Sequence, residues 1–190
     1  MEAAIIPSRF NPRNVLCSDI FLWNRNASSI IILSKVSVIT KYCLFKKVIV
    51  SNQIYDELTG TNISHKYDDI TMFNLLFLNK LLNIFRLPSD KKKHIDRLGL
   101  TCADASIIEL YYISKSQGIL TDDGKVCKLC KSRRIPYINS PMALFSLAAS
   151  NVISFEVFME KLDCVYTIGR YSKFVYDYMN GLIEKQKWNN

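Results

Sequence analysis

The sequence predicts an α/β fold in which parallel strands alternate with helices. Short β-branched or apolar runs alternate along the chain with longer segments whose apolar residues recur every three or four positions. This alternation is typical of a parallel sheet with crossover helices. The chain has 190 residues, 49% of them hydrophobic, and only six glycines and five prolines. It therefore has the size and core content of a single folded domain.

Apolar spacing and capping residues predict the elements of the first half of the chain. Apolar residues from Ile32 to Cys43 are three or four positions apart, so we expect one helix over 29–44 with a buried face. The other elements expected here are a strand within 20–25, a strand at 47–50, a helix at 53–58 that Ser51 or Asn52 caps and Gly60 ends, a helix at 70–82 and a strand at 83–87.

The second half begins with a capping-box spacing and ends in helices. Thr101 and Asp104 are three positions apart, which predicts the start of a helix over 101–116. The remaining predicted elements are a strand at 118–121, a helix at 125–133 that Asp122 and Asp123 precede, a strand at 135–138, and a helical segment over 141–187 with a break near 150–154.

Acidic residues fall at corresponding places in this scheme, where strands are followed by helices. Glu57 lies in the helix after one strand, Asp104 in the first turn of another helix, and Asp122 and Asp123 after a third strand. The carboxyl ends of parallel strands form one edge of the sheet, where ligands bind. Clustered carboxylates suit Mg²⁺. Taken singly, these residues are better explained as a solvated helix position, a capping box and an N-cap, and it is their shared placement that favours a functional site.

The charge of the chain favours an anionic partner. The formal net charge is +8 and the isoelectric point is about 9.2, which is typical of nucleic-acid binding but also of a generally basic surface. A basic group follows the aspartate pair and is a candidate for binding RNA phosphates, or a solvated helix face: Lys125, Lys128, Lys131, Arg133 and Arg134.

Other sequence features argue against a membrane or zinc protein. We find no signal-peptide pattern and no uninterrupted apolar run of about 18 residues, so we expect a cytoplasmic protein with reduced cysteines. Of the six cysteines, Cys127 and Cys130 form a lone Cys-x-x-Cys pair. Because two further ligands at matching spacing are missing, we do not expect a structural zinc site.

Several short motifs occur in a fixed order along the chain. They are NASSIIILSKV at 26–36, FKKVIVSNQIYDEL at 45–58, GLTCADASII at 99–108, ILTDD at 119–123, RIPYI at 134–138 and ALFSLAASNVI at 143–153. In this order they resemble the PIN-domain family, in particular its prokaryotic branch related to VapC-type toxin ribonucleases. No single motif is specific, and the resemblance depends on their order and spacing from about residue 19 to the end.

The resemblance implies both a fold and an activity. The fold is a three-layer α/β/α sandwich with a central parallel sheet over 14–140, preceded by a loose tail at 1–13 and followed by a helical extension over 141–190 packed on the same domain. The activity is that of a Mg²⁺- or Mn²⁺-dependent endoribonuclease that cuts RNA phosphodiesters with a metal-activated water. The resemblance also implies an antitoxin protein partner and a homodimer, and it permits a flap-type DNA nuclease.

Three of the family's acidic positions match carboxylates of this chain. The second position matches Glu57, the third Asp104, and the fourth Asp123 with Asp122 beside it. Thr121 matches the small hydroxyl residue of the last motif. The resemblance therefore implies that these carboxylates hold the metal and carry catalysis.

The first acidic position departs from the family pattern. Asn26 takes its place, with Ser28 nearby, although an alternative register puts Asp19 there. Asparagine ligates a metal through its carbonyl oxygen but brings no negative charge. The alternative function is therefore a catalytically weakened PIN-like protein that binds RNA or a protein partner.

Overall fold

A computed structural model describes residues 22–25, 27–60, 70–87, 100–186 and 188. The predicted tail at 1–13 and the two alternatives for the first acidic position, Asp19 and Asn26, lie outside these residues. In chain order the elements are β1 (Leu22–Arg25), α1 (Ala27–Lys35), α2 (Ile39–Phe45), β2 (Lys47–Ser51), α3 (Asn52–Thr59), α4 (Ile70–Leu78), β3 (Leu82–Phe85), α6 (Cys102–Ser114), β4 (Gly118–Leu120), α7 (Gly124–Ser132), β5 (Tyr137–Ile138), α8 (Ser140–Ala149), α9 (Phe155–Gly169) and α10 (Lys173–Lys185).

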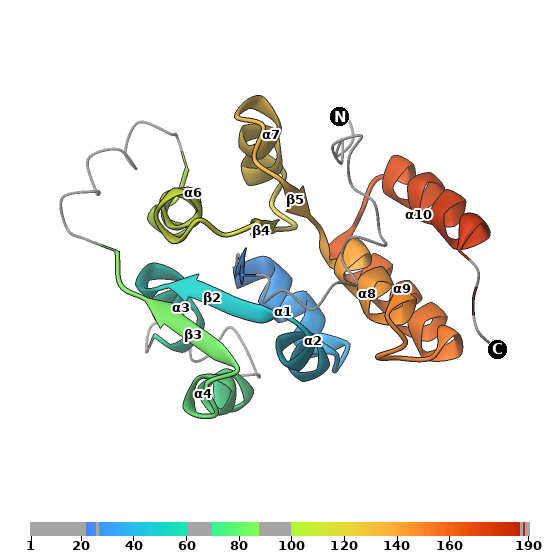
Figure 1. The fold of residues 1–190 in the computed structure, drawn as a ribbon, viewed down its shortest axis with the longest axis horizontal. Coiled ribbons are helices and arrows are strands. Elements are labelled where there is room, and N and C mark those ends of the chain that lie inside the picture. Colours follow the sequence, from blue (N-terminus) through green and yellow to red (C-terminus); the bar gives the residue numbers. More distant parts are fainter. Residues whose placement is uncertain (1–21, 26, 61–69, 88–99, 187, 189–190) are drawn as a thin grey trace.

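The strands form one parallel sheet, which confirms the predicted mixed α/β class (Figure 1). The order is β3-β2-β1-β4-β5, and every neighbouring pair is parallel. The chain passes from β1 outward to β2 and β3, then returns to the other side of β1 to form β4 and β5. Connections therefore leave β1 and β4 in opposite directions, which makes the carboxyl edge between these two strands the expected place for a ligand.

Burial along β2 shows that both faces of the sheet are covered at this strand. Val48, Ile49 and Val50 are all buried, and consecutive strand residues point to opposite faces. Helix α6 packs against β1, β2 and β4, while α2 and α3 also contact β2. A strand buried on both sides explains why the run Val-Ile-Val at 48–50 is continuously apolar rather than alternating.

The helix predicted over 29–44 is wrong as a single element, because it is broken at Ser37. This residue has φ of 59°, its N–H bonds to Ser34 O at 2.8 Å, and the N–H of Val38 bonds to Leu33 O at 3.0 Å. These are the two bonds of a Schellman motif, which ends a helix. Helices α1 and α2 are consequently bent by 117° relative to each other.

Other helices also end at a non-glycine residue in the left-handed conformation. Helix α4 ends at Leu78 rather than at 82, because Lys80 has φ of 55° and Leu81 N–H bonds to Leu76 O at 2.9 Å. Strand β3 therefore begins at Leu82, one residue earlier than predicted. Arg134 and Asn151 occupy the equivalent left-handed position after α7 and α8.

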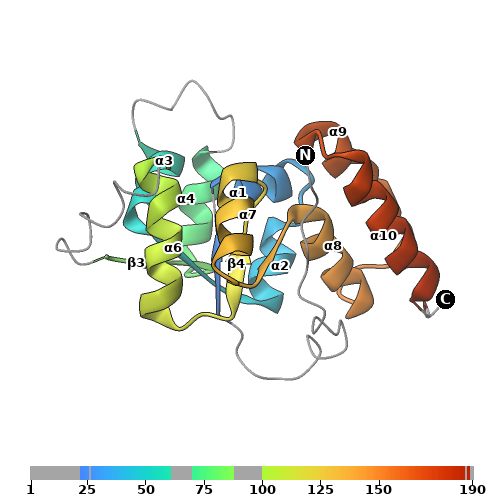
Figure 2. The ribbon, with the colours of Figure 1, turned by 90° about the horizontal axis from the view of Figure 1, so that it is seen from above.

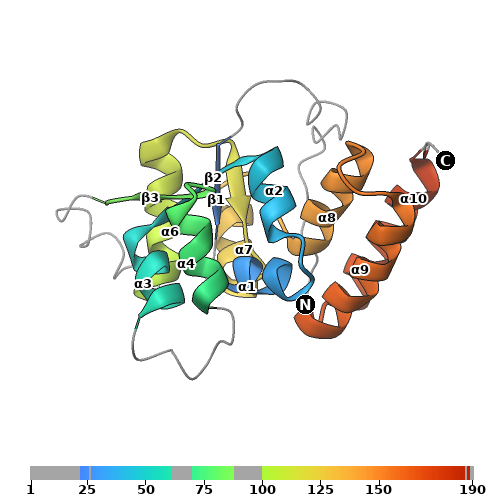
Figure 3. The same ribbon diagram turned by 90° about the horizontal axis from the view of Figure 1, so that it is seen from below.

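The C-terminal region consists of three helices rather than two segments. The break predicted near 150–154 is confirmed between α8 and α9, and a second break follows Gly169. The three helices lie side by side at one end of the molecule, next to α1 and α2 (Figure 2, Figure 3). Phe145, Phe158 and Trp188 pack their rings together there, and α8 and α9 contact α2 and α1. These helices therefore share the core of the sheet domain.

Within the described part of the chain, no helix alone has the length and apolar character to cross a membrane, and α1 with α2 pass that test only as a bent pair.

Candidate functional site

A hydrogen bond joins the ends of β1 and β4 where the connections diverge. Asp122 follows β4 and buried Thr121. The Oγ of Ser29, a buried residue in the first turn of α1, donates to Asp122 Oδ2 at 2.6 Å. Because α1 directly follows β1, this bond spans the carboxyl edge of the two central strands. It marks the candidate site.

Three further hydrogen bonds converge on the same carboxylate. Ser140, at the start of α8, donates its backbone N–H to Asp122 Oδ1 at 2.9 Å and its Oγ–H to Oδ2 at 2.5 Å. The hydroxyl of Tyr171, between α9 and α10, donates to Oδ1. Both oxygens of Asp122 thus accept bonds from described residues. Bonds to a charged acceptor are stronger than neutral ones, so Asp122 ties α1, α8 and the α9–α10 connection to the sheet.

The turn that carries Tyr171 is shaped for this contact. A Cβ added at Gly169 would lie 2.2 Å from Cε2 of the Tyr171 ring, so glycine is needed for the ring to approach. Arg170 adopts a left-handed conformation with φ of 50°. Burial, together with the charge of Asp122, raises the pKa of Tyr171 above its ordinary value. The hydroxyl therefore keeps its proton and remains a donor.

Asp123 has a separate role as the N-cap of α7. Its Oδ1 accepts from Lys125 N at 2.8 Å and from Val126 N at 2.9 Å, and its own N–H donates to Thr121 Oγ1 at 3.2 Å. The cap predicted for this aspartate is therefore confirmed. The cap uses Oδ1 of the carboxylate. The role of Asp123 as a metal ligand remains a prediction.

The β2 end of the same edge is joined by two serines. The Oγ atoms of Ser51, the last residue of β2, and Ser106, in α6, lie 2.5 Å apart. Ser51 Oγ also accepts from Ile54 N at 3.2 Å, which confirms it as the cap of α3. The start of α6 is therefore fixed beside the strand end from which α3 begins.

Glu57 and Asp104 lie on these two helices. Glu57 is half-buried on α3, which packs against α6. Asp104 is half-buried in the first turn of α6, where its Oδ2 accepts from Thr101 Oγ1 at 2.7 Å and its N–H donates to the same hydroxyl at 3.1 Å. Thr101 is thus the predicted cap.

The carboxylates have the right chemistry for a hard cation, but they are not gathered into one group. Among the described residues, no three His, Cys, Asp or Glu side chains lie together closely enough to hold a metal ion. Asn26 and Asp19, which a ligand set would draw on, lie outside the described residues, while Ser28 is half-buried in α1 beside Ser29. The fold brings the predicted acids to elements of one edge, and Asp122 is engaged in tying those elements.

The predicted basic residues are all exposed on or after α7. Helix α7 begins at the carboxyl edge and its nine residues extend about 13 Å toward the opposite edge, at 1.5 Å per residue. Lys125 therefore lies at the candidate site, whereas Arg133 and Arg134 follow the far end of the helix. Lys128 and Lys131 lie between them.

The Cys-x-x-Cys pair packs on the inner side of α7. Burial raises the pKa of both Cys127 and Cys130 to about 12, so these thiols stay protonated at neutral pH. Cys127 Sγ donates to Thr121 O at 3.8 Å. Protonated cysteines are poor nucleophiles. Cys130 is buried in the core and the partly buried Cys127 packs against it.

Sequence reasoning missed Ser29, Ser140, Tyr171 and Gly169. Serines at helix starts are common capping residues, so nothing in the sequence distinguishes these two from caps. Comparisons with protein-family models, with curated proteins and with solved structures find no match for this chain.

Proposed function

We propose that this chain is a PIN-like, metal-dependent endoribonuclease that acts at the carboxyl edge of its sheet. The observation that carries the proposal is the Asp122–Ser29 bond between the ends of β1 and β4, at the crossing point of the order β3-β2-β1-β4-β5. In open parallel sheets, ligands bind at such a point. The three-layer sandwich with a central sheet is part of this proposal, and burial on both faces of β2 supports it.

Glu57, Asp104 and Asp123 are the residues proposed to hold Mg²⁺ or Mn²⁺, with Asn26 and Ser28 completing the set. When bound, such an ion would supply an activated water and neutralise phosphate charge. The helices α3, α6 and α7 orient these carboxylates.

In this proposal Asp122 is a positioning residue. Its hydrogen bonds to Ser29 and Ser140 hold α1, and with it Ser28, against the end of β4.

RNA is the proposed substrate because the chain is basic, with a net charge of +8, and Lys125 and Lys128 are exposed on the helix that starts at the site. Phosphate contacts of this kind give salt-dependent affinity. The resemblance to VapC-type toxins supports two further proposals, a small antitoxin partner and a homodimer. A cytoplasmic location is a separate proposal from the sequence.

The test is Mg²⁺-dependent cleavage of a single-stranded RNA by the wild-type chain and by Glu57→Gln and Asp104→Asn. Both substitutions are expected to abolish cleavage because each removes a carboxylate charge. Glu160→Gln on α9, an exposed acid paired with Lys161, is the matched control and should cut like wild type. Wild type without activity, or activity that survives both substitutions, rejects the enzyme. Preferred cleavage of branched DNA would reassign the substrate.

A second candidate is a PIN-like protein that binds RNA or a protein partner without cutting. It is favoured by Asn26 at the first acidic position and by the engagement of both Asp122 oxygens. An inactive wild type that gains Mg²⁺-dependent cleavage on Asn26→Asp would establish this candidate. An active wild type would exclude it.

A further inference from the structure

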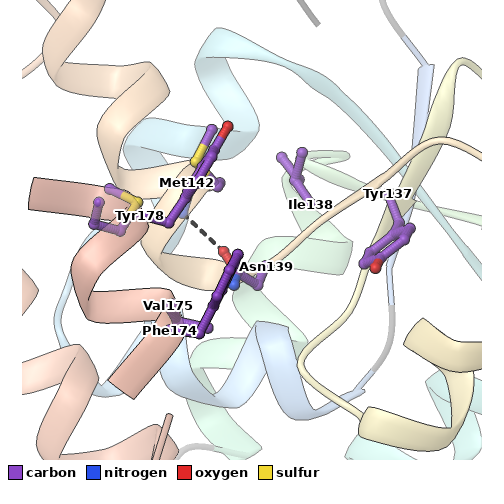
Figure 4. A pocket seen from close by; sticks show the side chains of 8 residues that line it. Tyr137, Ile138, Asn139, Met142, Phe174, Val175 and Tyr178 are labelled. Atoms are coloured by element: carbon purple, nitrogen blue, oxygen red, sulfur yellow. Dashed lines mark hydrogen bonds between the residues drawn. The ribbon is translucent and has the colours of Figure 1, made fainter. Parts of the chain in front are cut away.

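A small, partly open pocket lies between α10 and the junction of β5 with α8. Side chains from β5, α8 and α10 converge on it (Figure 4). Ile138, Met142 and Met179 are buried and apolar. The polar groups among the lining residues are the carboxamide of Asn139 and the hydroxyls of Tyr137 and Tyr178.

The carboxamide of Asn139 is held in one orientation. Its Oδ1 accepts from Met142 N at 3.1 Å, because Asn139 is the N-cap of α8. This leaves the amide nitrogen as the hydrogen-bond donor of the side chain, and no described residue accepts from it. The pocket therefore combines an apolar floor with an oriented donor.

The opposite wall carries a pair of parallel rings, of which Phe174 is exposed and Tyr178 is partly buried. Phe174 and Tyr178, one helical turn apart on α10, have centroids 6.3 Å apart and an interplanar angle of 7°. Phe174 is 48% exposed. Flat aromatic faces open to solvent are the surfaces on which single-stranded nucleic acids stack their bases.

Residues that line the pocket are close along the chain to residues of the candidate site. Ser140, which follows Asn139, and Tyr171, three residues before Phe174, both donate to Asp122. An occupant of the pocket is thus next to the carboxyl edge of the sheet. Because the chain carries a net charge of +8 and Lys125 is exposed at this edge, a polyanion is the complementary partner.

The interior of the pocket, at about 10 Å³, has room for about one water molecule, so a larger occupant would lie on the exposed Phe174 ring at its mouth. We propose that one nucleobase of a single-stranded RNA stacks on Phe174 at the mouth of this pocket and accepts a hydrogen bond from the Asn139 amide. The inference rests on the proposed function, since it places the base beside the phosphodiester that the site would cut. An apolar side chain of a protein partner is the competing occupant. Binding of such a side chain needs apolar area on residue 174 but does not need an aromatic ring there.

Two substitutions of Phe174 separate these occupants. Phe174→Leu keeps apolar area and removes the ring, whereas Phe174→Tyr keeps the ring. Tyr112, an aromatic residue on α6 that is 51% exposed, supplies the matched control Tyr112→Leu. The measurement is the Kd of a fluorescent, mixed-sequence single-stranded RNA by anisotropy in EDTA, at two salt concentrations.

We expect Phe174→Leu to weaken binding about 5- to 150-fold, the range for one stacked base. Phe174→Tyr and Tyr112→Leu should bind like wild type, and the salt dependence should not change because the phosphate contacts remain. Asn139→Ser, which retains a helix cap without the amide, should weaken binding further when combined with Phe174→Leu.

RNA binding that Phe174→Leu leaves unchanged would overturn the inference, as would equal losses for Phe174→Leu and Phe174→Tyr, or no RNA binding by wild type. The proposed function fails separately. If RNA binding depends on the Phe174 ring but Mg²⁺-dependent cleavage is absent, base binding at Phe174 is supported and the nuclease function is rejected. If cleavage is present and Phe174→Leu changes neither Kd nor KM, the nuclease function is supported and base binding at Phe174 is rejected.

Discussion

The β4 end and the β2 end of the sheet's carboxyl edge are tied together by different chemistry. At the β4 end the tie is a carboxylate, Asp122, which accepts bonds from Ser29, Ser140 and Tyr171. At the β2 end it is a pair of neutral hydroxyls, Ser51 and Ser106. Acids at one edge of a sheet can therefore have different roles. Substitution of Asp122 should cost stability, whereas substitution of Glu57 or Asp104 should cost activity.

The largest expected effect is the loss of Asp122. Asp122→Ala leaves the buried hydroxyls of Ser29 and Ser140 and the hydroxyl of Tyr171 without their acceptor. Each buried donor left unsatisfied costs about 1–3 kcal/mol, and water replaces part of the loss, so we expect about 3–5 kcal/mol less stability. Urea unfolding is the measurement. A loss in the free energy of unfolding no larger than that of Glu160→Ala would show that Asp122 does not stabilise the contacts between these elements.

The next effect tests the hydroxyl that reaches Asp122 from the C-terminal helices. Tyr171→Phe removes one bond to a charged acceptor and should cost about 1.5–3 kcal/mol near neutral pH. The raised pKa of Tyr171 gives the sign of the pH dependence: its stabilisation is complete below the ordinary tyrosine pKa of about 10 and falls as pH rises further.

The stability difference between wild type and Tyr171→Phe should therefore shrink above about pH 10. Tyr137 has a pKa raised to about 12, but it is present in both proteins and cancels in the difference. A difference that stays constant up to about pH 11.5 would contradict the buried, protonated hydroxyl. Gly169→Ala, which displaces the Tyr171 ring, should reproduce the loss seen at neutral pH.

A smaller effect is expected at the β2 end. Ser106 Oγ donates to Ala103 O at 2.5 Å, so its single hydrogen is used and Ser51 supplies the hydrogen between the two serines. Ser106→Ala leaves that buried Ser51 hydrogen without an acceptor, at a cost of about 1–2 kcal/mol. Urea unfolding should place this variant between wild type and Asp122→Ala. A loss as large as that of Asp122→Ala would erase the contrast between the two ends.

The strands were predictable because their signals are local. The runs around Val48 and Ile119 are apolar and short, and the caps Ser51, Thr101 and Asp123 precede helices, as the spacing predicts. Two helix ends were predicted less well, because Ser37 and Lys80 occupy left-handed positions where glycine is the usual signal. The Asp122 network could not be predicted from the sequence, because Ser29, Ser140 and Tyr171 are far apart along the chain and come together only in the folded structure.

The smallest expected effect on stability separates the capping role of Asp123 from its proposed metal role. This residue caps α7 through Oδ1, and serine is a comparably good cap. Asp123→Ser should therefore keep stability within a few tenths of a kcal/mol, whereas Asp123→Ala should lose about 1 kcal/mol. If the carboxylate holds a metal ion, Asp123→Ser should nevertheless lose Mg²⁺-dependent cleavage, because a neutral hydroxyl does not replace a charged ligand. A serine variant that is as stable and as active as wild type would leave Asp123 as a cap alone, and the two neighbouring aspartates would then both be structural.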